Sequence, residues 1–223
     1  MPTECPVHPE DWNVVVAARW NPALFTPAAI SRRVFKLAEG TPIEVFVVLD
    51  DVQLPRIKHD GMIVAPSTTQ LVISPERCAF TRLERARQMA RGVVNELSRT
   101  PLIAAGFNLR YRADAIPHSL AQRFSEELDH RFADNDFQII GRQFHRVLRF
   151  NNGRLLVQVT RDPDGKAELL MNFEHRSKES AALSEWLSVP IEDVRDTAIR
   201  VLSTVLQLQD TDYVIENDEH AGQ

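Results

Sequence analysis

Short stretches of the chain alternate apolar and polar residues, which is typical of strands that bury one face. In the stretch 14–20, the even-numbered residues Val14, Val16, Ala18 and Trp20 are apolar. In the stretch 102–112, every odd-numbered residue from 103 to 111 is apolar or aromatic. We predict these two strands, a central strand at 42–49 that is apolar on both faces, and further strands at 62–65, 70–73, 137–150, 154–161 and 167–174.

Helical periodicity separates these strands. The clearest apolar stripe follows Thr81, which has the spacing of a capping box with Glu84. Thr26 and Pro27 supply a capping hydroxyl and a proline at the first helical position, so we expect an earlier helix that ends at Gly40. We also predict a helix from Pro117, closing helices from Ser177 and Ser188, and a hairpin turn at Asn152-Gly153.

The predicted elements follow the order strand, helix, three strands, helix twice, at 13–98 and 102–208. The two halves share a weak echo, VAARWN at 16–21 and IAAGFN at 103–108, although two buried strands can also match by chance. Because either half alone would expose the apolar face of its sheet, we predict one α+β domain in which both halves build one long antiparallel sheet with helices packed on one face. Residues 1–12 are then an N-terminal extension, and 209–223 an acidic flexible tail. In topology alone, this arrangement resembles the saddle-shaped TATA-binding-type folds.

Composition limits the class of protein. Of the 223 residues, 43% are hydrophobic and 26% charged, which is too apolar for a disordered chain. Two cysteines are too few for a disulfide scaffold, and the longest apolar run, 45–49, is far shorter than a membrane helix. The acidic, proline-containing N-terminus does not have the pattern of a secretory signal. We therefore expect a cytoplasmic globular protein that does not bind membranes.

Charge is distributed unevenly along the chain. The formal net charge is −5, but residues 1–76 carry −3, residues 77–161 carry +7 and residues 162–223 carry −9. A basic middle can recruit an anionic partner, or it can be balanced internally by the acidic C-terminal part. The even-numbered positions of 102–112 fall on the sheet face opposite the helices, and with neighbouring strands they form an amide- and arginine-rich surface. Our candidates for binding an anionic partner or nucleic acid are Asn108, Arg110, Arg112, Arg142, Arg146 and Arg154. The same surface can also bind an acidic protein or be simply solvated.

A five-residue segment, Gln53-Leu54-Pro55-Arg56-Ile57, lies in a predicted loop. It resembles the short peptides with which bacterial proteins bind the sliding clamp of replication, where a glutamine contacts the rim of a pocket and two apolar residues fill it. The resemblance implies partner-binding roles for Gln53, Leu54 and Ile57, whereas Arg56 stands where that family usually has an aliphatic residue. A second match, at 70–73, falls in a predicted strand, and we expect its own sheet to use it.

Signatures of catalysis are weak. The eight glycines are scattered, so the sequence has no phosphate-binding loop. Cys5 and His8 have zinc-like spacing, but the other two candidate ligands, His59 and Cys78, are isolated, so we predict no metal and no cofactor. Further candidates for acid–base or ion chemistry are Glu126, Asp129, His130, His145 and His175, and the paired acids Asp50-Asp51 and Asp134/Asp136. Their spacing is equally typical of solvated helix pairs and of turns.

These observations predict a non-catalytic protein that works by binding another macromolecule, and a protein in preference to nucleic acid. A toxin, an antitoxin or an inhibitor would fit, with the sliding clamp of DNA replication as one named target. Two alternatives stay open: nucleic-acid binding through the arginine-rich sheet face, and an enzyme built around Glu126, Asp129, His130 or His145. The open edges of a long sheet also offer a strand for pairing with a second chain.

Overall fold

A computed structural model describes residues 5–47, 54–124, 127–162 and 164–210. Within them, ten strands form one sheet, which is antiparallel apart from the parallel pairing of its first and last strands. The strands are β1 Cys5–Ala18, β2 Glu44–Phe46, β3 Arg56–His59, β4 Met62–Pro66, β5 Gln70–Pro75, β6 Leu102–Ala113, β7 Arg142–Phe150, β8 Gly153–Arg161, β9 Ala167–Arg176 and β10 Leu208–Asp210. The helices are α1 Pro27–Arg33, α2 Phe80–Glu96, α3 His118–Ala121, α4 Glu127–Ala133, α5 Ser180–Trp186 and α6 Ile191–Arg200, with short 3-10 segments η1 Pro22–Phe25 and η2 Gln122–Phe124 and a π-helical end η3 Val201–Leu206. The predicted α+β class with a long, mainly antiparallel sheet is confirmed.

The strand order places the beginnings of the two halves at the centre of the sheet. The order is β2-β3-β4-β5-β1-β6-β9-β8-β7, with β10 beside β1. From β1 the first half continues outward through β5, β4 and β3, and from β6 the second half continues outward through β9, β8 and β7. The two halves are joined by the antiparallel pair β1–β6, and the first half has one further strand, β2, at its outer end. Their origin by duplication stays a prediction.

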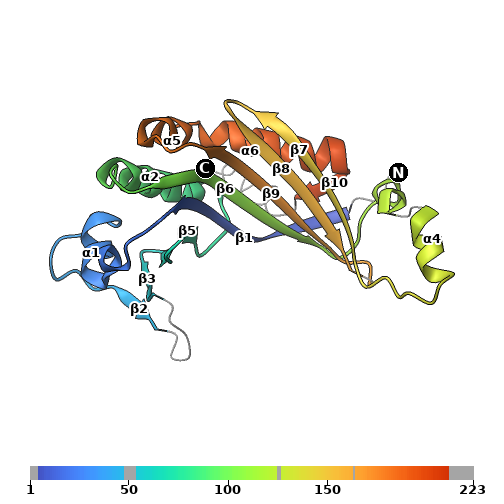
Figure 1. The fold of residues 1–223 in the computed structure, drawn as a ribbon, viewed down its shortest axis with the longest axis horizontal. Helices are drawn as coiled ribbons and strands as arrows, with labels where there is room; N and C mark the ends of the chain where they lie inside the picture. Colours follow the sequence, from blue (N-terminus) through green and yellow to red (C-terminus); the bar gives the residue numbers. More distant parts are fainter. Residues whose placement is uncertain (1–4, 48–53, 125–126, 163, 211–223) are drawn as a thin grey trace, which may run out of the picture.

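Helices cover one face of this sheet (Figure 1). α2 contacts β1 and β5, α5 contacts β6 and β9, and α6 packs beside α2. Apolar side chains of the sheet that point toward these helices, such as Val14 and Phe107, belong to one buried cluster. Trp186 of α5 belongs to the same cluster. Trp186 is completely buried, with its ring 5.8 Å from that of Phe150. The helices thus close a core to which both halves contribute.

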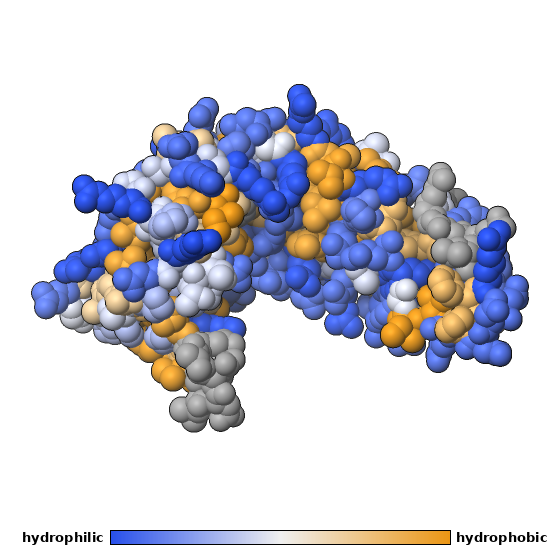
Figure 2. Space-filling view, viewed as in Figure 1, coloured by the Kyte–Doolittle hydropathy of each residue, from blue (hydrophilic) through white to orange (hydrophobic). Residues whose placement is uncertain are grey.

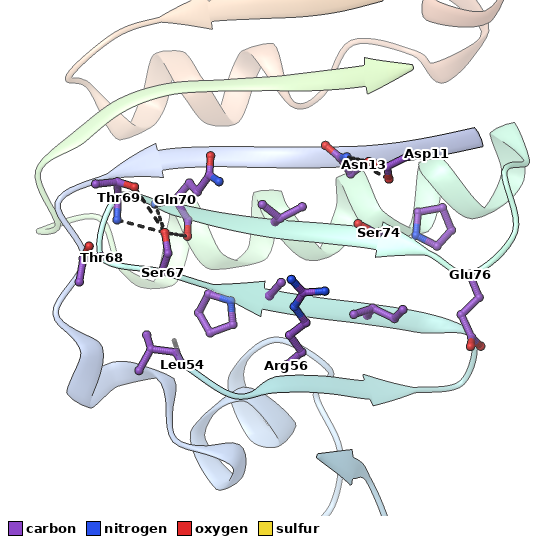
Figure 3. Close-up of a pocket in the computed structure, with 15 residues that line it drawn as sticks. Asp11, Asn13, Leu54, Arg56, Ser67, Thr68, Thr69, Gln70, Ser74 and Glu76 are labelled. Carbon is purple, nitrogen blue, oxygen red and sulfur yellow. Dashed lines mark hydrogen bonds between the residues drawn. The ribbon is translucent and has the colours of Figure 1, made fainter. Parts of the chain in front are cut away.

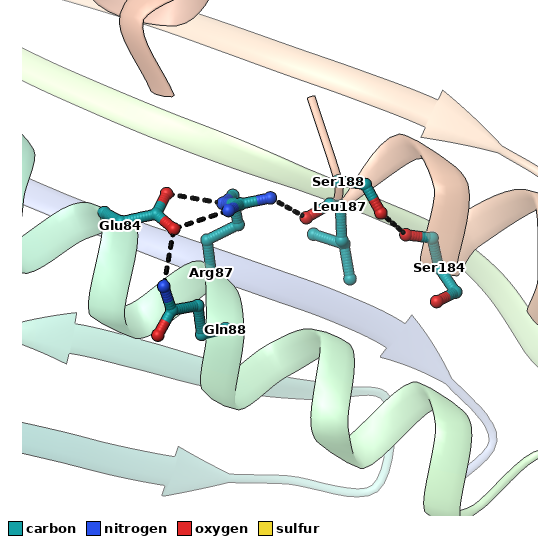
Figure 4. A network of polar contacts seen from close by, with 6 residues as sticks. All are labelled: Glu84, Arg87, Gln88, Ser184, Leu187 and Ser188. Carbon is teal, nitrogen blue, oxygen red and sulfur yellow. Dashed lines mark hydrogen bonds and ion pairs between the residues drawn. The ribbon is translucent and has the colours of Figure 1, made fainter. Parts of the chain in front are cut away.

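Arg87 connects α2 to the end of α5 (Figure 4). Its guanidinium donates to Glu84 on the same helix (Nε–Oε2, 2.6 Å) and to the backbone carbonyl of Leu187 (Nη1–O, 2.5 Å). Gln88 donates to the same carboxylate (2.7 Å). Burial raises the pKa of Glu84, but the hydrogen bonds from Arg87 and Gln88 together lower it by more, so the pKa lies below its ordinary value of 4.5. The ionised carboxylate therefore holds the arginine that joins the two helices.

One predicted helix cap is confirmed and another is wrong. Thr26 caps α1, since its Oγ1 accepts a hydrogen bond from the backbone N–H of Ala29 (3.2 Å). The capping box predicted for Thr81 and Glu84 does not form. Helix α2 begins one residue before Thr81 without a side-chain cap, and Glu84 binds Arg87 instead. Contacts of Glu84 with Arg87 and Gln88 of the same helix have replaced the predicted cap.

The first half differs from prediction at three strands. β1 begins at Cys5, so most of the predicted extension 1–12 belongs to the sheet, and a register shift between Pro9 and Asp11 accommodates the proline. The central strand predicted at 42–49 is β2, a short edge strand whose Val45 and Phe46 are exposed. Residues 56–59, predicted as part of a loop, form β3. The apolar residues of β2 therefore lie at the edge of the sheet, whereas the charged segment 56–59 forms the next strand inward.

Two further predictions in the second half are corrected. The helix predicted from Pro117 is divided into α3, η2 and α4, and β7 begins at Arg142 instead of Phe137. The three-residue strand β10 was not predicted, because a strand this short has no readable periodicity.

The hairpin between β7 and β8 turns one residue earlier than predicted. Its turn consists of Asn151-Asn152, with Asn151 in the left-handed region (φ 48°), and Gly153 is the first residue of β8. A Cβ at Gly153 would lie 2.5 Å from the carbonyl oxygen of Glu174 and 2.8 Å from the ring of Trp186. Close packing, and not the turn conformation, therefore requires this glycine.

Candidate binding surface on the concave side of the sheet

The sheet face away from the helices is hollow, and none of the helices that the structure describes covers it (Figures 1 and 2). Directly paired residues of neighbouring strands share a face, so the register identifies its members. This surface, which we name the concave face, includes Val72, Val15, Asn13, Asn108, Arg110, Asn172, Leu170, Arg154 and Leu156. Most of these side chains are half-buried, whereas their neighbours on the covered face are buried. The concave face is therefore a partly exposed surface that extends across the strands from β5 to β8.

A groove of about 990 Å³ forms the concave face under β1, β3, β4 and β5 (Figure 3). The turn between β4 and β5 closes one end, where the Ser67 hydroxyl accepts a hydrogen bond from the backbone N–H of Gln70 (3.0 Å). The lining includes Asn13, Leu54, Arg56, Ile63, Ser67 and Val72. The lining thus combines hydroxyl, amide and aliphatic groups with the charged side chains of Asp11, Arg56 and Glu76.

Three asparagines cross the centre of the concave face on adjacent strands. The register pairs Asn13 of β1 with Asn108 of β6, and Asn108 with Asn172 of β9. Asn172 Nδ2 donates to Asn108 Oδ1 (2.5 Å), Asn108 Nδ2 donates to Asn13 Oδ1 (2.9 Å), and Asn13 Nδ2 donates to the carboxylate of Asp11 (3.3 Å). An amide has two donor hydrogens and two acceptor sites, so a chain of single bonds leaves capacity on each member. Asn108 and Asn172 are half-buried and can donate to, and accept from, a bound ligand, whereas Asn13 is buried and holds Asn108 in place.

Acidic partners neutralise two of the arginines of the concave face. Arg110 lies 3.7 Å from Glu168 on β9, and Arg154 forms an ion pair with Glu174. At the first-half end, Lys58 Nζ contacts Glu76 at 2.7 Å and Glu44 at 3.6 Å.

The hydrogen bond to Glu76 raises the pKa of Lys58 above its ordinary value of 10.5, and Glu44 adds to the effect. The lysine therefore stays charged and paired with carboxylates. Three cations of the concave face are thus paired with carboxylates, whereas Arg56, Arg112 and Arg149 have no carboxylate partner among the described residues.

The six residues predicted to form one arginine-rich surface do not lie together. Asn108, Arg110, Arg112 and Arg154 do share the concave face. Arg142 and Arg146 have the opposite parity on β7, so they lie on the covered face. Arg142 is bound there to Asp129 of α4 (Nε–Oδ2, 2.7 Å). Sequence alternation failed at this strand, because arginines occur on both of its faces.

The segment that resembles sliding-clamp peptides is not an accessible loop at its C-terminal end. Gln53 lies outside the described residues, and Leu54 is half-buried beside the groove. Ile57 is in β3, fully buried on the covered face and paired with Val64. Because both apolar residues of such a peptide must enter a partner's pocket, Ile57 is available only if β3 leaves the sheet. The predicted accessibility of this segment is therefore wrong at Ile57.

The acid–base candidates are dispersed. Glu126, Asp50 and Asp51 lie outside the described residues, and Asp129 is used by Arg142. His175 donates from Nδ1 to the carbonyl of Asn152 (2.9 Å) and stacks on Trp186. The remaining candidates lie on exposed surface: His130 on α4, His145 on β7, and Asp134 and Asp136 in the turn after α4.

Among the described residues, no group of three or more His, Cys, Asp or Glu side chains is arranged to hold a metal ion. Of the four candidate zinc ligands, Cys5 is buried in β1 and Cys78 is half-buried before α2. His59 hydrogen bonds the carbonyl of Pro42 (3.2 Å) and packs against Phe35.

Comparison with known protein families finds none that matches this chain, and comparison with curated proteins finds no related sequence. In the part of the chain that the structure describes, no helix is both long and apolar enough to cross a membrane.

Sequence reasoning missed most residues of the groove and two thirds of the asparagine row. Asn13 and Asn172 were not candidates, because only the register shows that they flank Asn108. The available signal was weak: Asn108 and Asn172 fall inside predicted strands, where asparagine is disfavoured, and Asn13 directly precedes another.

Proposed function

We propose that this chain is a non-catalytic binding protein whose concave face holds an extended segment of another protein. The observation that carries the proposal is an uncovered sheet face that has the asparagine row at its centre and aliphatic side chains on both sides of that row. Peptide groups both donate and accept hydrogen bonds, as the asparagine amides do. Half-buried aliphatic residues on either side, Val72 and Ile63 in one half and Leu156 and Leu170 in the other, supply apolar contacts.

The size of the surface suits a peptide segment. From β4 to β8 the sheet contains six adjacent strands. Five spacings of about 4.8 Å give a width of roughly 24 Å, which about seven residues of an extended chain would span.

Charge favours a protein over nucleic acid as the occupant. A single strand of nucleic acid needs cations along its phosphates. On the concave face Arg110 and Arg154 already have carboxylate partners, and Arg142 and Arg146 lie on the other side of the sheet. A polyanion would therefore have to break existing ion pairs to use Arg110 or Arg154, and the cations without a carboxylate partner among the described residues, Arg56, Arg112 and Arg149, lie on three separate strands.

Site-directed photo-crosslinking in the source cells tests the proposal. A photoreactive residue is placed at Val72 and, separately, at Leu170 on the concave face, with Gln88 on the exposed side of α2 as the matched control. We expect the same protein to crosslink from both concave positions and not from Gln88. The crosslinked protein is then purified and titrated against the chain, and Val72→Arg should weaken binding at least tenfold while Gln88→Arg leaves it unchanged.

Two results would overturn the proposal. One is equal crosslinking from Gln88, which would place the partner on the helices. The other is tight, salt-dependent binding of a labelled 20-nucleotide single strand that Val72→Glu abolishes, which would make nucleic acid the occupant. Thermal unfolding of each variant distinguishes lost binding from lost folding.

A further inference from the structure

β7, at the outer end of the second half, is an open edge of the sheet. Among the described strands it pairs with β8 alone, over all nine residues from Arg142 to Phe150. The opposite edge, β2, has three residues. Proteins usually shorten or cover exposed edges, because unpaired backbone groups attract other strands. A long open edge at one end only therefore needs an explanation.

The register shows which backbone groups of β7 are available. A two-residue turn makes the pair Phe150–Gly153 a hydrogen-bonded pair, and such pairs alternate along an antiparallel ladder. The N–H and C=O groups of Gln143, His145, Val147 and Arg149 consequently point away from β8. In agreement, the carbonyl of His145 accepts a hydrogen bond from the side chain of Arg146 (2.8 Å).

Apolar side chains flank this edge on both faces. Val147 is 56% exposed on the concave face, and Leu148 is 43% exposed on the covered face. An added strand would remove part of both side chains from water, which favours binding.

The edge carries positive charge. β7 has three arginines and one histidine, β8 has two arginines, and neither strand has an acidic residue. Asp129 binds Arg142 and Glu174 binds Arg154. Arg146 and Arg149 have no carboxylate partner among the described residues.

Arg146 is held in place by stacking over the ring of Phe144, with its Cζ 4.3 Å from the ring centroid. It therefore stays beside the open edge, on the covered face, while Arg149 lies on the concave face. Like charges that face each other across a ladder are destabilising, so a second copy of β7 is a poor match. The complement of this edge is an acidic strand.

We propose that β7 binds an acidic, extended segment of a partner protein as an additional antiparallel or parallel strand. The backbone groups of the four outward-facing residues supply the hydrogen bonds, Val147 and Leu148 the apolar contacts, and Arg146 and Arg149 the charge selection. This site is separate from the groove under the first half, and it does not depend on the function proposed for the concave face.

The test uses the full chain and two nine-residue peptides of alternating valine and charged residues, one with glutamate and one with lysine. Hydrogen exchange measured by NMR should slow on adding the glutamate peptide at the outward amides of His145, Val147 and Arg149. The already bonded amide of Leu148 should change little.

Val147→Pro is the decisive variant, because it removes an outward N–H without removing a bond to β8. It should weaken binding of the glutamate peptide at least tenfold, whereas Val147→Thr, which keeps the N–H, should weaken it less than threefold. The double variant Arg146→Glu/Arg149→Glu should reverse the preference toward the lysine peptide.

Three outcomes would overturn the proposal: equal binding of the two peptides, full binding by a folded Val147→Pro variant, or a dimer of the chain whose sedimentation is changed by Val147→Pro. If Val147→Pro does not fold, the exchange pattern and the charge-reversal variant decide. Failure of this test leaves the groove under β1, β3, β4 and β5 untouched, because none of these variants alters its lining.

Discussion

Gly153 gives a sharp test of the packing between the second-half hairpin and α5. An added methyl group would meet the carbonyl oxygen of Glu174 at 2.5 Å and two ring carbons of Trp186 at 2.8 and 2.9 Å. Ordinary contacts begin at 3.4 Å, so the strand and the ring must move by about 0.9 and 0.6 Å respectively. Neither is free to move, because Glu174 is paired on both sides in β9 and Trp186 is completely buried.

Overpacking a core of this kind costs about 1–3 kcal/mol, and the reduced freedom of the unfolded chain returns less than about 1 kcal/mol. We therefore expect Gly153→Ala to lower the free energy of unfolding by about 2 kcal/mol. For a chain of this length that corresponds to a fall of about 4–8 °C in the melting temperature.

Gly92→Ala is the matched control, and we expect it to have the opposite sign. Gly92 lies inside α2, and a Cβ there would meet no atom within 4 Å. Alanine is the better helix former by about 0.8–1.0 kcal/mol, so this variant should be more stable than the wild type.

Guanidinium unfolding followed by circular dichroism and by tryptophan fluorescence measures both changes. A Gly153→Ala variant as stable as the wild type, with an unaltered tryptophan signal, would refute the packing argument. If both variants changed the free energy of unfolding in the same direction, the conformational freedom of glycine, and not the contact with Glu174 and Trp186, would determine the effect.

Two titratable residues give further expectations. Burial raises the pKa of Tyr111 well above its ordinary value of 10.0, and its hydroxyl has no hydrogen-bond partner among the described residues. Above pH 10 the native state keeps a proton that the unfolded state loses, so the free energy of unfolding should fall with rising pH. Tyr111→Phe should remove this part of the loss. At pH 7 the same variant should change the free energy of unfolding, measured with urea, by less than about 0.5 kcal/mol. The ionised carboxylate of Glu84 has the opposite dependence: its contribution is complete above pH 4.5 and is lost as the pH falls through the lower pKa of the folded state. Glu84→Gln should therefore be less stable than the wild type at pH 7 and lose less stability between about pH 5 and pH 3, and an unchanged acid slope would contradict this role.

Periodicity predicted the fold well where each strand has one buried face. The alternation at 14–20 and 102–112 located the two central strands, and the covered face of β6 is buried as expected from Ala105 to Tyr111. It failed where exposure and hydrophobicity disagree. Val45 and Phe46 suggested a buried strand, yet they lie at the exposed edge, because position in the sheet depends on pairing partners far away in the chain.

The site was harder to predict than the fold, because it depends on register. Arg110 and Arg146 both stand in predicted strands that contain further arginines. However, Arg110 lies beside Glu168 on the concave face, whereas Arg146 stacks over Phe144 on the covered face. A shift of one residue between β7 and β8 would exchange the two faces of β7. Local residue patterns do not determine that shift, whereas the turn at Asn151-Asn152 and the contact between Gly153 and Trp186 do.

The position of β1 has a consequence for synthesis on the ribosome. This strand emerges first, but its partners β5, β6 and β10 are completed only when residues 75, 113 and 210 have been made. Contacts between residues so distant in the chain form slowly, and an early strand without neighbours is prone to wrong pairing. Nascent chains that end before residue 113 should consequently need protection by a chaperone, and the last strand of the sheet to be made, β10, closes it beside the beginning of β1.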